Sequence, residues 1–210
     1  MKAAVFDLDG TLVDSREDIY LAVAHALGVM GLPPRSLDEV TSFVGEGARR
    51  LVARAVAPRD HLVDEALSLW RAHYADHLLD HTRLYPGIEA ALASSRVPMA
   101  VHTNKPGAMA RRILDGLGVL GRFAAVVGGD EAPRKPDPTG TLEILGRLGA
   151  RPDDAVFIGD STVDLATAAA AGVRFVPVAW GFVPVGDLAG AGASGFAFGA
   201  ADLLPWLAAG

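Results

Sequence analysis

Five short apolar segments recur along the chain, and the helical patterns between them narrow the choice of fold. The apolar segments are residues 3–8, 98–102, 124–127, 155–158 and 173–178. Amphipathic patterns indicate helices at 86–95, 106–118, 138–149 and 162–171. Short apolar strands that alternate with helices are typical of a parallel sheet covered by helices on both faces. The sequence therefore predicts an α/β fold.

The interval between the first two predicted strands is too long for a simple connection. Residues 9–96 fill it, whereas a crossover with one helix needs about 30 residues at most. Helical patterns occupy most of the interval, so we expect a helical domain inserted into the sheet domain. The predicted insertion spans residues 15–82, and the predicted core consists of residues 1–14 and 83–210.

Two serines in the predicted insertion have the pattern of a helix start. Ser15 is followed by Asp18, and Ser36 by Glu39, at the spacing of a capping box. A longer helix is predicted from about residue 60 to residue 81.

That longer helix would carry three histidines, His73, His77 and His81, on one face. A single helix supplies few converging metal ligands. We therefore interpret the histidines as a solvated or dimer-facing stripe and not as a metal site.

Composition and charge exclude several classes of protein. The formal net charge is −6 and the pI about 5.4, so the surface repels phosphate backbones and we expect no nucleic-acid partner. The absence of cysteine excludes disulfides, thiol catalysis and cysteine-based zinc sites. No apolar run approaches the roughly 18–20 residues that span a bilayer, and early acidic residues spoil a signal-peptide core. We expect a cytoplasmic monomer or homodimer without a membrane partner.

Polar residues follow four of the predicted strands at the point where each strand ends. They are Asp7, Asp9 and Thr11 after the first strand, Thr103, Asn104 and Lys105 after the second, Lys135 near the third, and Asp160 and Asp164 after the fourth. Carboxyl ends of parallel strands meet at one edge of a sheet, so we expect these residues to form one rim. Lysine otherwise occurs at position 2 alone, and this scarcity favours a specific role for Lys135.

The acidic residues of this rim suit phosphoryl transfer. Carboxylates gathered in one crevice repel one another and need a cation, and Mg²⁺ prefers oxygen ligands. An ionised carboxylate such as Asp7 can then act as a nucleophile. Asp9 would stand on the same side of the strand and could exchange protons with the leaving group and with water. Thr103 and Lys135 can bind and neutralise a phosphoryl group, whereas the rim has no Ser–His pair for acyl transfer.

Four motifs on this rim resemble those of the haloacid-dehalogenase-like hydrolases. They are FDLDGTLVDS at 6–15, TN at 103–104, KPDP at 135–138 and GDSTVD at 159–164. They occur in that family's order, and the resemblance covers the whole chain. The helical insertion directly after DxDGT is similar to the family's C1 cap. The stretches VGEGARRLV at 44–52 and HTNKP at 102–106 resemble the phosphoglycolate phosphatase branch.

This resemblance implies catalytic roles for individual residues. Asp7 would be the nucleophile that becomes an aspartyl-phosphate, and Asp9 the general acid and base. Thr103 and Asn104 would bind the phosphoryl group of the substrate, and Lys135 would stabilise the charge cluster.

The resemblance also implies a Mg²⁺ cofactor and a sheet order. Asp7, the backbone carbonyl of Asp9 and Asp160 would bind the ion, with Asp164 among its ligands or directly behind them. The core would be a Rossmann-like parallel sheet with strands in the order 5-4-1-2-3, and the α-helical cap domain would be inserted after strand 1.

Specificity would reside in the insertion and in one lysine of the core. Gly45, Gly47 and Arg49 form either a plain helix break or a cap loop that reaches into the site, in which case Gly45 and Arg49 contact the substrate. Lys105 is either a ligand of a substrate anion or a solvated charge.

The sequence thus predicts a Mg²⁺-dependent phosphatase acting on a small phosphorylated metabolite, with phosphoglycolate the first candidate on branch resemblance. A sugar phosphomutase would use the same rim, and a phospho-receiver domain gathers similar residues beside Mg²⁺. A receiver needs neither a second acid two residues after the first nor an inserted lid, which favours an enzyme. A phosphonatase would need a lysine in the insertion, and residues 15–82 contain none.

Overall fold

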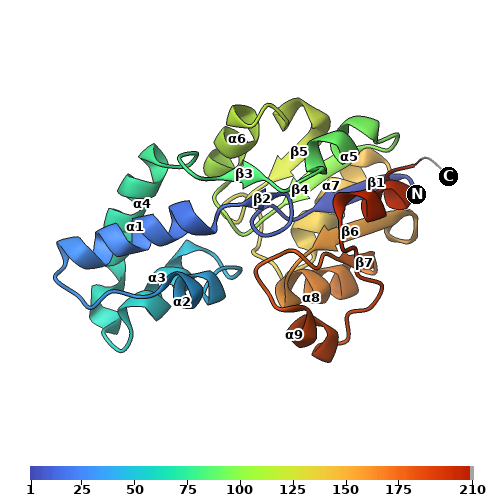
Figure 1. Cartoon of the computed structure of the whole chain (residues 1–210). Helices are drawn as coiled ribbons and strands as arrows, with labels where there is room; N and C mark the ends of the chain where they lie inside the picture. Colours follow the sequence, from blue (N-terminus) through green and yellow to red (C-terminus); the bar gives the residue numbers. More distant parts are fainter. Residues whose placement is uncertain (209–210) are drawn as a thin grey trace.

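The computed structural model describes residues 1–208, and its centre is a five-stranded parallel sheet (Figure 1). The strands are β1 (Ala3–Phe6), β4 (Met99–His102), β5 (Phe123–Val127), β6 (Ala155–Gly159) and β7 (Arg174–Pro177). They lie side by side in the order β5-β4-β1-β6-β7. Numbered among themselves along the chain and read from the β7 edge, they have the order 5-4-1-2-3. The predicted α/β class is confirmed.

Helices cover both faces of this sheet. Those of the core are α5 (Ile88–Ser94), α6 (Gly107–Gly116), α7 (Thr139–Leu148), α8 (Thr162–Ala171), α9 (Val185–Gly190) and α10 (Leu204–Leu207). Short 3-10 turns lie at Asp60–Leu62, Leu120–Arg122, Pro152–Asp154 and Ala200–Leu203. Ala4 and Phe6 of β1 pack in the apolar layer with α5 and α6, whereas Ala3 and Val5 pack in the layer with α7 and α8. Successive side chains of a strand point to opposite faces, so a strand covered on both must be apolar throughout.

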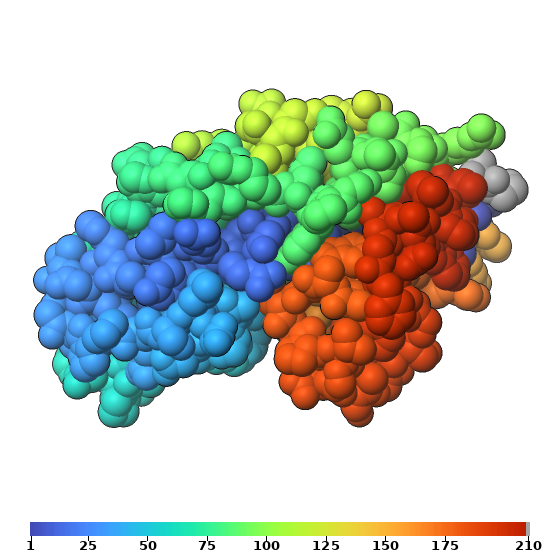
Figure 2. Space-filling model, in the orientation of Figure 1, coloured from blue at the N-terminus to red at the C-terminus, as the bar shows by residue number. Residues whose placement is uncertain are grey.

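A group of four helices lies to one side of the sheet, on the left of Figure 1. These are α1 (Arg16–Val29), α2 (Leu37–Ser42), α3 (Ala48–Val56) and α4 (Val63–Asp76). The chain enters this group through β2 (Val13–Asp14) and returns through β3 (Arg83–Leu84), and the two short strands pair antiparallel. In the space-filling view of Figure 2, the blue helical group and the orange and red C-terminal part form two lobes with a notch between them. The exact domain boundaries at residues 15 and 82 stay a prediction.

The two predicted capping boxes have different outcomes. The Ser36 side chain accepts from the backbone N–H of Glu39, and the Glu39 carboxylate accepts from that of Ser36, so this prediction is confirmed. Ser15 precedes α1 but caps nothing with its side chain, so that prediction is wrong. The Ser15 hydroxyl donates to Asp9 at 2.5 Å instead, while Asp18 accepts from residues at the far end of the helical group.

The helix predicted at 60–81 is shorter than expected, because α4 begins after a 3-10 turn and ends at Asp76. The carboxylate of Asp18 explains where the chain goes next. It accepts from the backbone N–H groups of His81 and Thr82, at 2.9 and 2.8 Å, and from the Thr82 hydroxyl at 2.6 Å. These bonds draw the chain after α4 back towards α1, where β3 begins.

His81 therefore lies outside α4, and the prediction of three histidines on one helical face is wrong. His73 of α4 instead stacks between His77 and His25 of α1, with ring centroids 4.3 and 4.2 Å apart. The stripe is a contact between two helices, which sequence spacing along one helix could not reveal.

Across the residues that the structure describes, every helix is too short or too polar to cross a membrane.

Candidate active site

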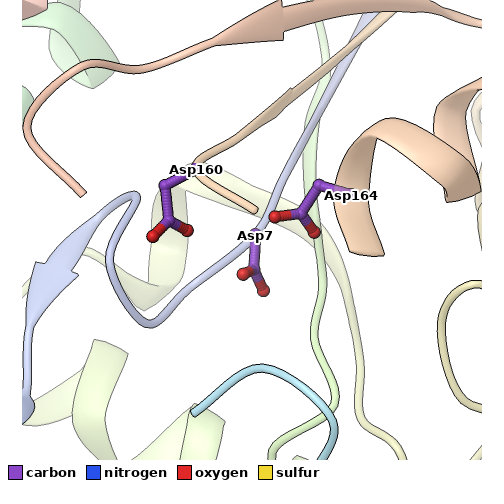
Figure 3. Close-up of side chains that lie close together, drawn as sticks. All are labelled: Asp7, Asp160 and Asp164. Atoms are coloured by element: carbon purple, nitrogen blue, oxygen red, sulfur yellow. The ribbon is translucent and has the colours of Figure 1, made fainter. Parts of the chain in front are cut away.

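Three acidic side chains converge at the carboxyl edge of the sheet (Figure 3). Asp7 follows β1, Asp160 follows β6, and Asp164 lies in the first turn of α8. One carboxylate oxygen from each residue lies within 4.8 Å of the other two, and all three residues are buried. The sequence predicted this convergence because carboxyl ends of parallel strands meet at one edge of a sheet. In the structure β1 and β6 are neighbours.

Lys135 is the counter-charge of this cluster. Its ammonium nitrogen lies 2.7 Å from Asp7 Oδ1 and 2.6 Å from Asp164 Oδ1, and its side chain is 2% exposed. The other oxygen of Asp164 accepts from the backbone N–H and the hydroxyl of Ser161. Asp164 thus meets a cation through one oxygen and accepts two hydrogen bonds through the other, whereas Asp160 accepts one hydrogen bond at each oxygen. This difference favours a place for Asp164 behind the metal ligands.

Asp160 is held by donors on both of its oxygens. Oδ1 accepts from the Thr11 hydroxyl at 3.1 Å, and Oδ2 accepts from the backbone N–H of Phe182 at 2.7 Å. A Cβ atom at Gly10 would lie 2.2 Å from Oδ2, and one at Gly181 would lie 2.1 Å from the Asp160 Cβ. Both positions must be glycine for the two loops to close on this carboxylate. The sequence did not reveal Gly181, which lies outside the motifs.

The cluster holds more negative charge than one lysine neutralises. Burial and the neighbouring Asp164 raise the pKa of Asp7 to about 7, although Lys135 acts in the opposite direction. Burial, Asp164 and Asp7 raise the pKa of Asp160 to about 8. Crowded buried carboxylates of this kind favour a divalent cation with oxygen ligands, and Mg²⁺ fits this donor set.

Asp9 lies outside this acidic cluster and has its own lysine. Its two oxygens lie 2.7 and 2.9 Å from the ammonium nitrogen of Lys105, which also donates to the Tyr74 hydroxyl of α4 at 2.8 Å. The Ser15 hydroxyl provides a further donor to Asp9. The Lys105 side chain is 5% exposed, so the alternative of a solvated charge is wrong. Its charge is matched by Asp9, which weakens the case for Lys105 as the main ligand of a substrate anion.

Thr103 and Asn104 follow β4 as predicted, but their side chains are used differently. Thr103 is buried, and its hydroxyl oxygen accepts from the Lys105 backbone N–H, which leaves the hydroxyl proton to donate. The amide of Asn104 donates to the carbonyls of Gly45 and Lys135 and accepts from the Lys135 N–H. Asn104 therefore fastens the loop of Lys135 and the loop of the helical group to each other.

A pocket of about 50 Å³ lies between the sheet edge and the helical group. Its floor, contributed by the core, consists of Asp7, Asp9, Thr103, Asn104, Lys105 and Pro106. Its roof, contributed by the helical group, consists of Ile19, Val44, Gly45, Gly47, Ala48, Leu51 and Trp70. This volume accommodates a few water molecules or a ligand of few atoms.

The roof contains Gly45, as predicted, but the guanidinium group of Arg49 does not reach it. That group forms an ion pair with Asp64 at 2.6 Å, and its side chain is 54% exposed. Arg49 lies in the first turn of α3 and does not line the pocket, and its predicted contact with substrate stays a prediction. Trp70 and Tyr74 were not predicted, because their spacing indicates no more than a buried helical face.

Comparison with known proteins identifies the family. Residues 4–178 match the family described as haloacid dehalogenase-like hydrolase. The chain belongs to this family. Phosphoglycolate phosphatase from Cereibacter sphaeroides is 44% identical over 200 residues, which cover 90% of each chain. Phosphoglycolate phosphatase 1 from Pseudomonas aeruginosa is 40% identical over 193 residues, which cover 86% of this chain and 70% of that one.

Solved structures of the family have the same fold. A crystal structure of a predicted phosphoglycolate phosphatase from Haemophilus somnus matches with a TM-score of 0.91 and 30% identity, over 98% of this chain and 97% of that one. A predicted phosphatase from Clostridium acetobutylicum matches with a TM-score of 0.86 and 26% identity, over 97% and 96% of the two chains. With these relatives, the haloacid dehalogenase-like hydrolase described here is a phosphoric monoester hydrolase.

Proposed function

We propose that this hydrolase is a Mg²⁺-dependent phosphatase of a small phosphorylated metabolite, with phosphoglycolate as the first candidate substrate. One observation carries the proposal: Asp7 lines the pocket while its carboxylate lies in the acidic cluster, 2.7 Å from Lys135. A nucleophile, a counter-charge and a cation site thus meet where a phosphoryl group can enter. The names of the relatives support phosphoglycolate as the substrate to test first.

The reaction would proceed in two displacements at phosphorus. A carboxylate oxygen of Asp7 forms a bond to phosphorus as the ester P–O bond breaks, and Asp9, which must be protonated in the substrate complex, gives that proton to the departing alkoxide. A water molecule then attacks the aspartyl-phosphate, Asp9 takes its proton, and inorganic phosphate leaves with the Asp7 carboxylate restored. Lys135 and the Thr103 hydroxyl neutralise and bind phosphoryl oxygens throughout.

The residues of the acidic cluster would bind the metal ion and orient Lys135. Asp7, Asp160 and the backbone carbonyl of Asp9 would hold Mg²⁺, with Asp164 orienting Lys135 from behind. When bound, the ion supplies positive charge that offsets the carboxylates and the phosphoryl group.

The helical group would serve as a cap domain over this chemistry. We assign residues 15–82 to the cap and residues 1–14 and 83–210 to the catalytic core, with β2 and β3 as the two connections. The contact of Asn104 with the carbonyl of Gly45 holds the cap loop over the floor. A small pocket beneath the cap limits substrates to small esters, and closure of the cap during turnover would restrict bulk water.

The test is release of inorganic phosphate from phosphoglycolate by the purified chain. We expect many turnovers per chain with Mg²⁺, loss of activity with EDTA, and recovery when Mg²⁺ is restored. Asp7→Asn should lower kcat by at least about 10³-fold while the protein stays folded, because an amide is a poor nucleophile. The matched control is Asp154→Asn. Asp154 is partly exposed, forms an ion pair with Lys2 and lies far from the site.

Other outcomes would assign a different function. An isomerised sugar phosphate without net phosphate release would indicate a phosphomutase, and at most one phosphoryl group per chain would indicate a phospho-receiver domain. Activity of Asp7→Asn within tenfold of the wild type would overturn the nucleophile assignment. Full activity in metal-free buffer would overturn the assignment of Mg²⁺.

A further inference from the structure

The roof of the pocket contains a buried hydrogen-bond donor without a partner. Trp70 is 3% exposed, and its indole nitrogen is buried and has no hydrogen-bond partner among the described residues. A buried donor left unpaired costs free energy, so it needs an explanation such as a ligand.

The surroundings of Trp70 show from which side a partner can come. Besides the active-site pocket, Trp70 borders one smaller cavity, whose other lining residues are Val23, Ala26, Leu27, Val52, Ala55, Val56 and Ala66. All of these side chains are aliphatic, so they offer no acceptor. The active-site pocket, which Trp70 also lines, is the cavity beside this side chain where a polar ligand can enter.

The start of α3 supplies further donors to the same roof. Gly47 and Ala48 line the pocket, and no side chain caps this helix. The first hydrogen bond of the helix runs from the Leu51 N–H to the Gly47 carbonyl. The N–H groups of Ala48, Arg49 and Arg50 precede it and have no partner within the helix, and such an N-terminus attracts negative charge.

The roof residues of the pocket include no acidic side chain. Glu46, between the two lining glycines, forms ion pairs with Arg50 and Arg54 along the outer side of α3. In the floor, the charge of Lys105 is matched by Asp9. A second anionic group of a substrate would thus meet neutral N–H donors at the roof of the same pocket.

We propose that the Trp70 indole N–H and the first N–H groups of α3 bind a carboxylate at the end of the substrate remote from the phosphate. This inference rests on the proposed function and deepens it: the substrate class is a small phosphate ester that carries a carboxylate. Trp70 is a specificity-determining residue that acts through binding and leaves the chemistry at Asp7 untouched.

The experiment compares two ligands that differ in the carboxylate. Binding of phosphoglycolate and of ethyl phosphate is measured by calorimetry with Mg²⁺ in the Asp7→Asn background, which prevents turnover. We expect phosphoglycolate to bind at least tenfold more tightly than ethyl phosphate. Trp70→Phe keeps the aromatic ring and deletes the N–H, so it should weaken phosphoglycolate binding about tenfold and change ethyl phosphate binding less than twofold.

A backbone variant tests the helix start. Ala48→Pro deletes the first N–H of α3, and Gly47 has a ψ of 163°, the extended conformation that a following proline requires. We expect it to weaken phosphoglycolate binding about fivefold, again without effect on ethyl phosphate. The matched control is Leu37→Pro at the first position of α2, where Ser36 has the same ψ of 163° and Leu37 does not line the active-site pocket.

Trp206→Phe is the control for loss of an indole elsewhere, because Trp206 packs against Arg174 and does not line the pocket. Equal binding of the two ligands to the parent protein would overturn the carboxylate site. So would a Trp70→Phe variant that weakens both ligands equally, since that is the signature of a packing role. Turnover of the same esters by the wild-type chain tests the proposed function separately, because the binding preference is measured without turnover.

Discussion

The floor of the pocket contains buried ion pairs, whereas the residues that line its roof are uncharged. In the floor and just behind it, buried charges are paired side by side: Lys135 with Asp7 and Asp164, and Lys105 with Asp9. The roof presents apolar side chains and neutral N–H groups, and the charges of α3 point outwards. Fixed charges can stabilise the charge that develops on a phosphoryl group during the reaction. Neutral N–H donors suit a substrate group that is bound but does not react.

Ion pairs of the floor are buried, whereas those around the roof are exposed, and the two kinds contribute differently to the free energy of unfolding. A buried pair that loses one partner leaves an uncompensated charge and costs about 3–5 kcal/mol, whereas an exposed pair contributes about 0–1 kcal/mol. Substitutions in the floor should therefore affect both stability and chemistry, and substitutions of charges around the roof should affect neither strongly.

The largest effect is expected for Lys135→Met. The change leaves Asp7 and Asp164 buried without their counter-charge, so we expect the free energy of unfolding to fall by about 3 kcal/mol at pH 7 and kcat to fall by about 10³-fold. Urea unfolding and phosphate release measure the two effects. Lys2→Met is the control, because its pair with Asp154 is exposed and should be worth less than about 1 kcal/mol. Equal losses in the two variants would contradict the division between buried and exposed pairs.

The second prediction concerns pH and metal. The pKa values of Asp7 and Asp160 are raised in the folded protein to about 7 and about 8, above the ordinary value of 3.8. Folding is then favoured by protonation, so this contribution to stability is complete below about pH 4 and is lost as the pH rises through 7 and 8. Each of the two groups contributes about 1.4 kcal/mol per pH unit below its folded-state pKa, so we expect metal-free protein to lose several kcal/mol of stability between pH 5 and pH 8.

Mg²⁺ should offset this loss, because a bound cation stabilises the ionised carboxylates. Thermal unfolding at both pH values, with and without Mg²⁺, provides the measurement, and we expect the ion to stabilise more at pH 8 than at pH 5. Asp160→Asn is the comparison variant and should show a smaller pH dependence and a smaller response to Mg²⁺. A response to Mg²⁺ that is unchanged in this variant would place the ion elsewhere.

The third prediction tests what holds the roof above the floor. Asp18 is 1% exposed and accepts from His81 and Thr82, which joins the two connections of the helical group. Asp18→Ala leaves buried donors unpaired, so we expect a loss of about 2 kcal/mol in urea unfolding. Asp38→Ala, at an exposed acid of α2, is the control and should cost less than about 0.5 kcal/mol. If the two variants lose the same stability, the hydrogen bonds of Asp18 do not hold the two connections of the helical group together.

The floor could be predicted from the sequence because its geometry follows from the strands. Asp7, Lys135, Asp160 and Asp164 each follow a β-strand, and parallel topology alone brings strand ends together. The strand order came from family resemblance, since the apolar runs indicate strands without indicating neighbours. The sequence did not predict which charges of the floor form ion pairs, such as Lys105 with Asp9.

The roof could not be predicted in the same way. Trp70 and Tyr74 have the spacing of any buried helical face. That Trp70 lines the pocket and that Tyr74 accepts from Lys105 depends on how α4 packs against the rest of the molecule. Arg49 was a candidate substrate contact of the cap loop, yet its guanidinium group forms an ion pair with Asp64 of α4. Contacts between helices decide both cases, and periodicity along one helix does not encode them.

The smallest effect is expected for Glu46→Gln, and it is the sharpest test of the neutral roof. Glu46 lies between two glycines that line the pocket, but its carboxylate is paired with Arg50 and Arg54 at the surface of α3. We expect kcat/KM for phosphoglycolate to stay within twofold and stability to change by less than about 0.5 kcal/mol. Steady-state kinetics at low and at 0.5 M salt, where exposed charges are screened over about 4 Å, would verify this. A change above fivefold would mean that the roof presents a charge to the substrate, and recognition by neutral donors would then lose its basis.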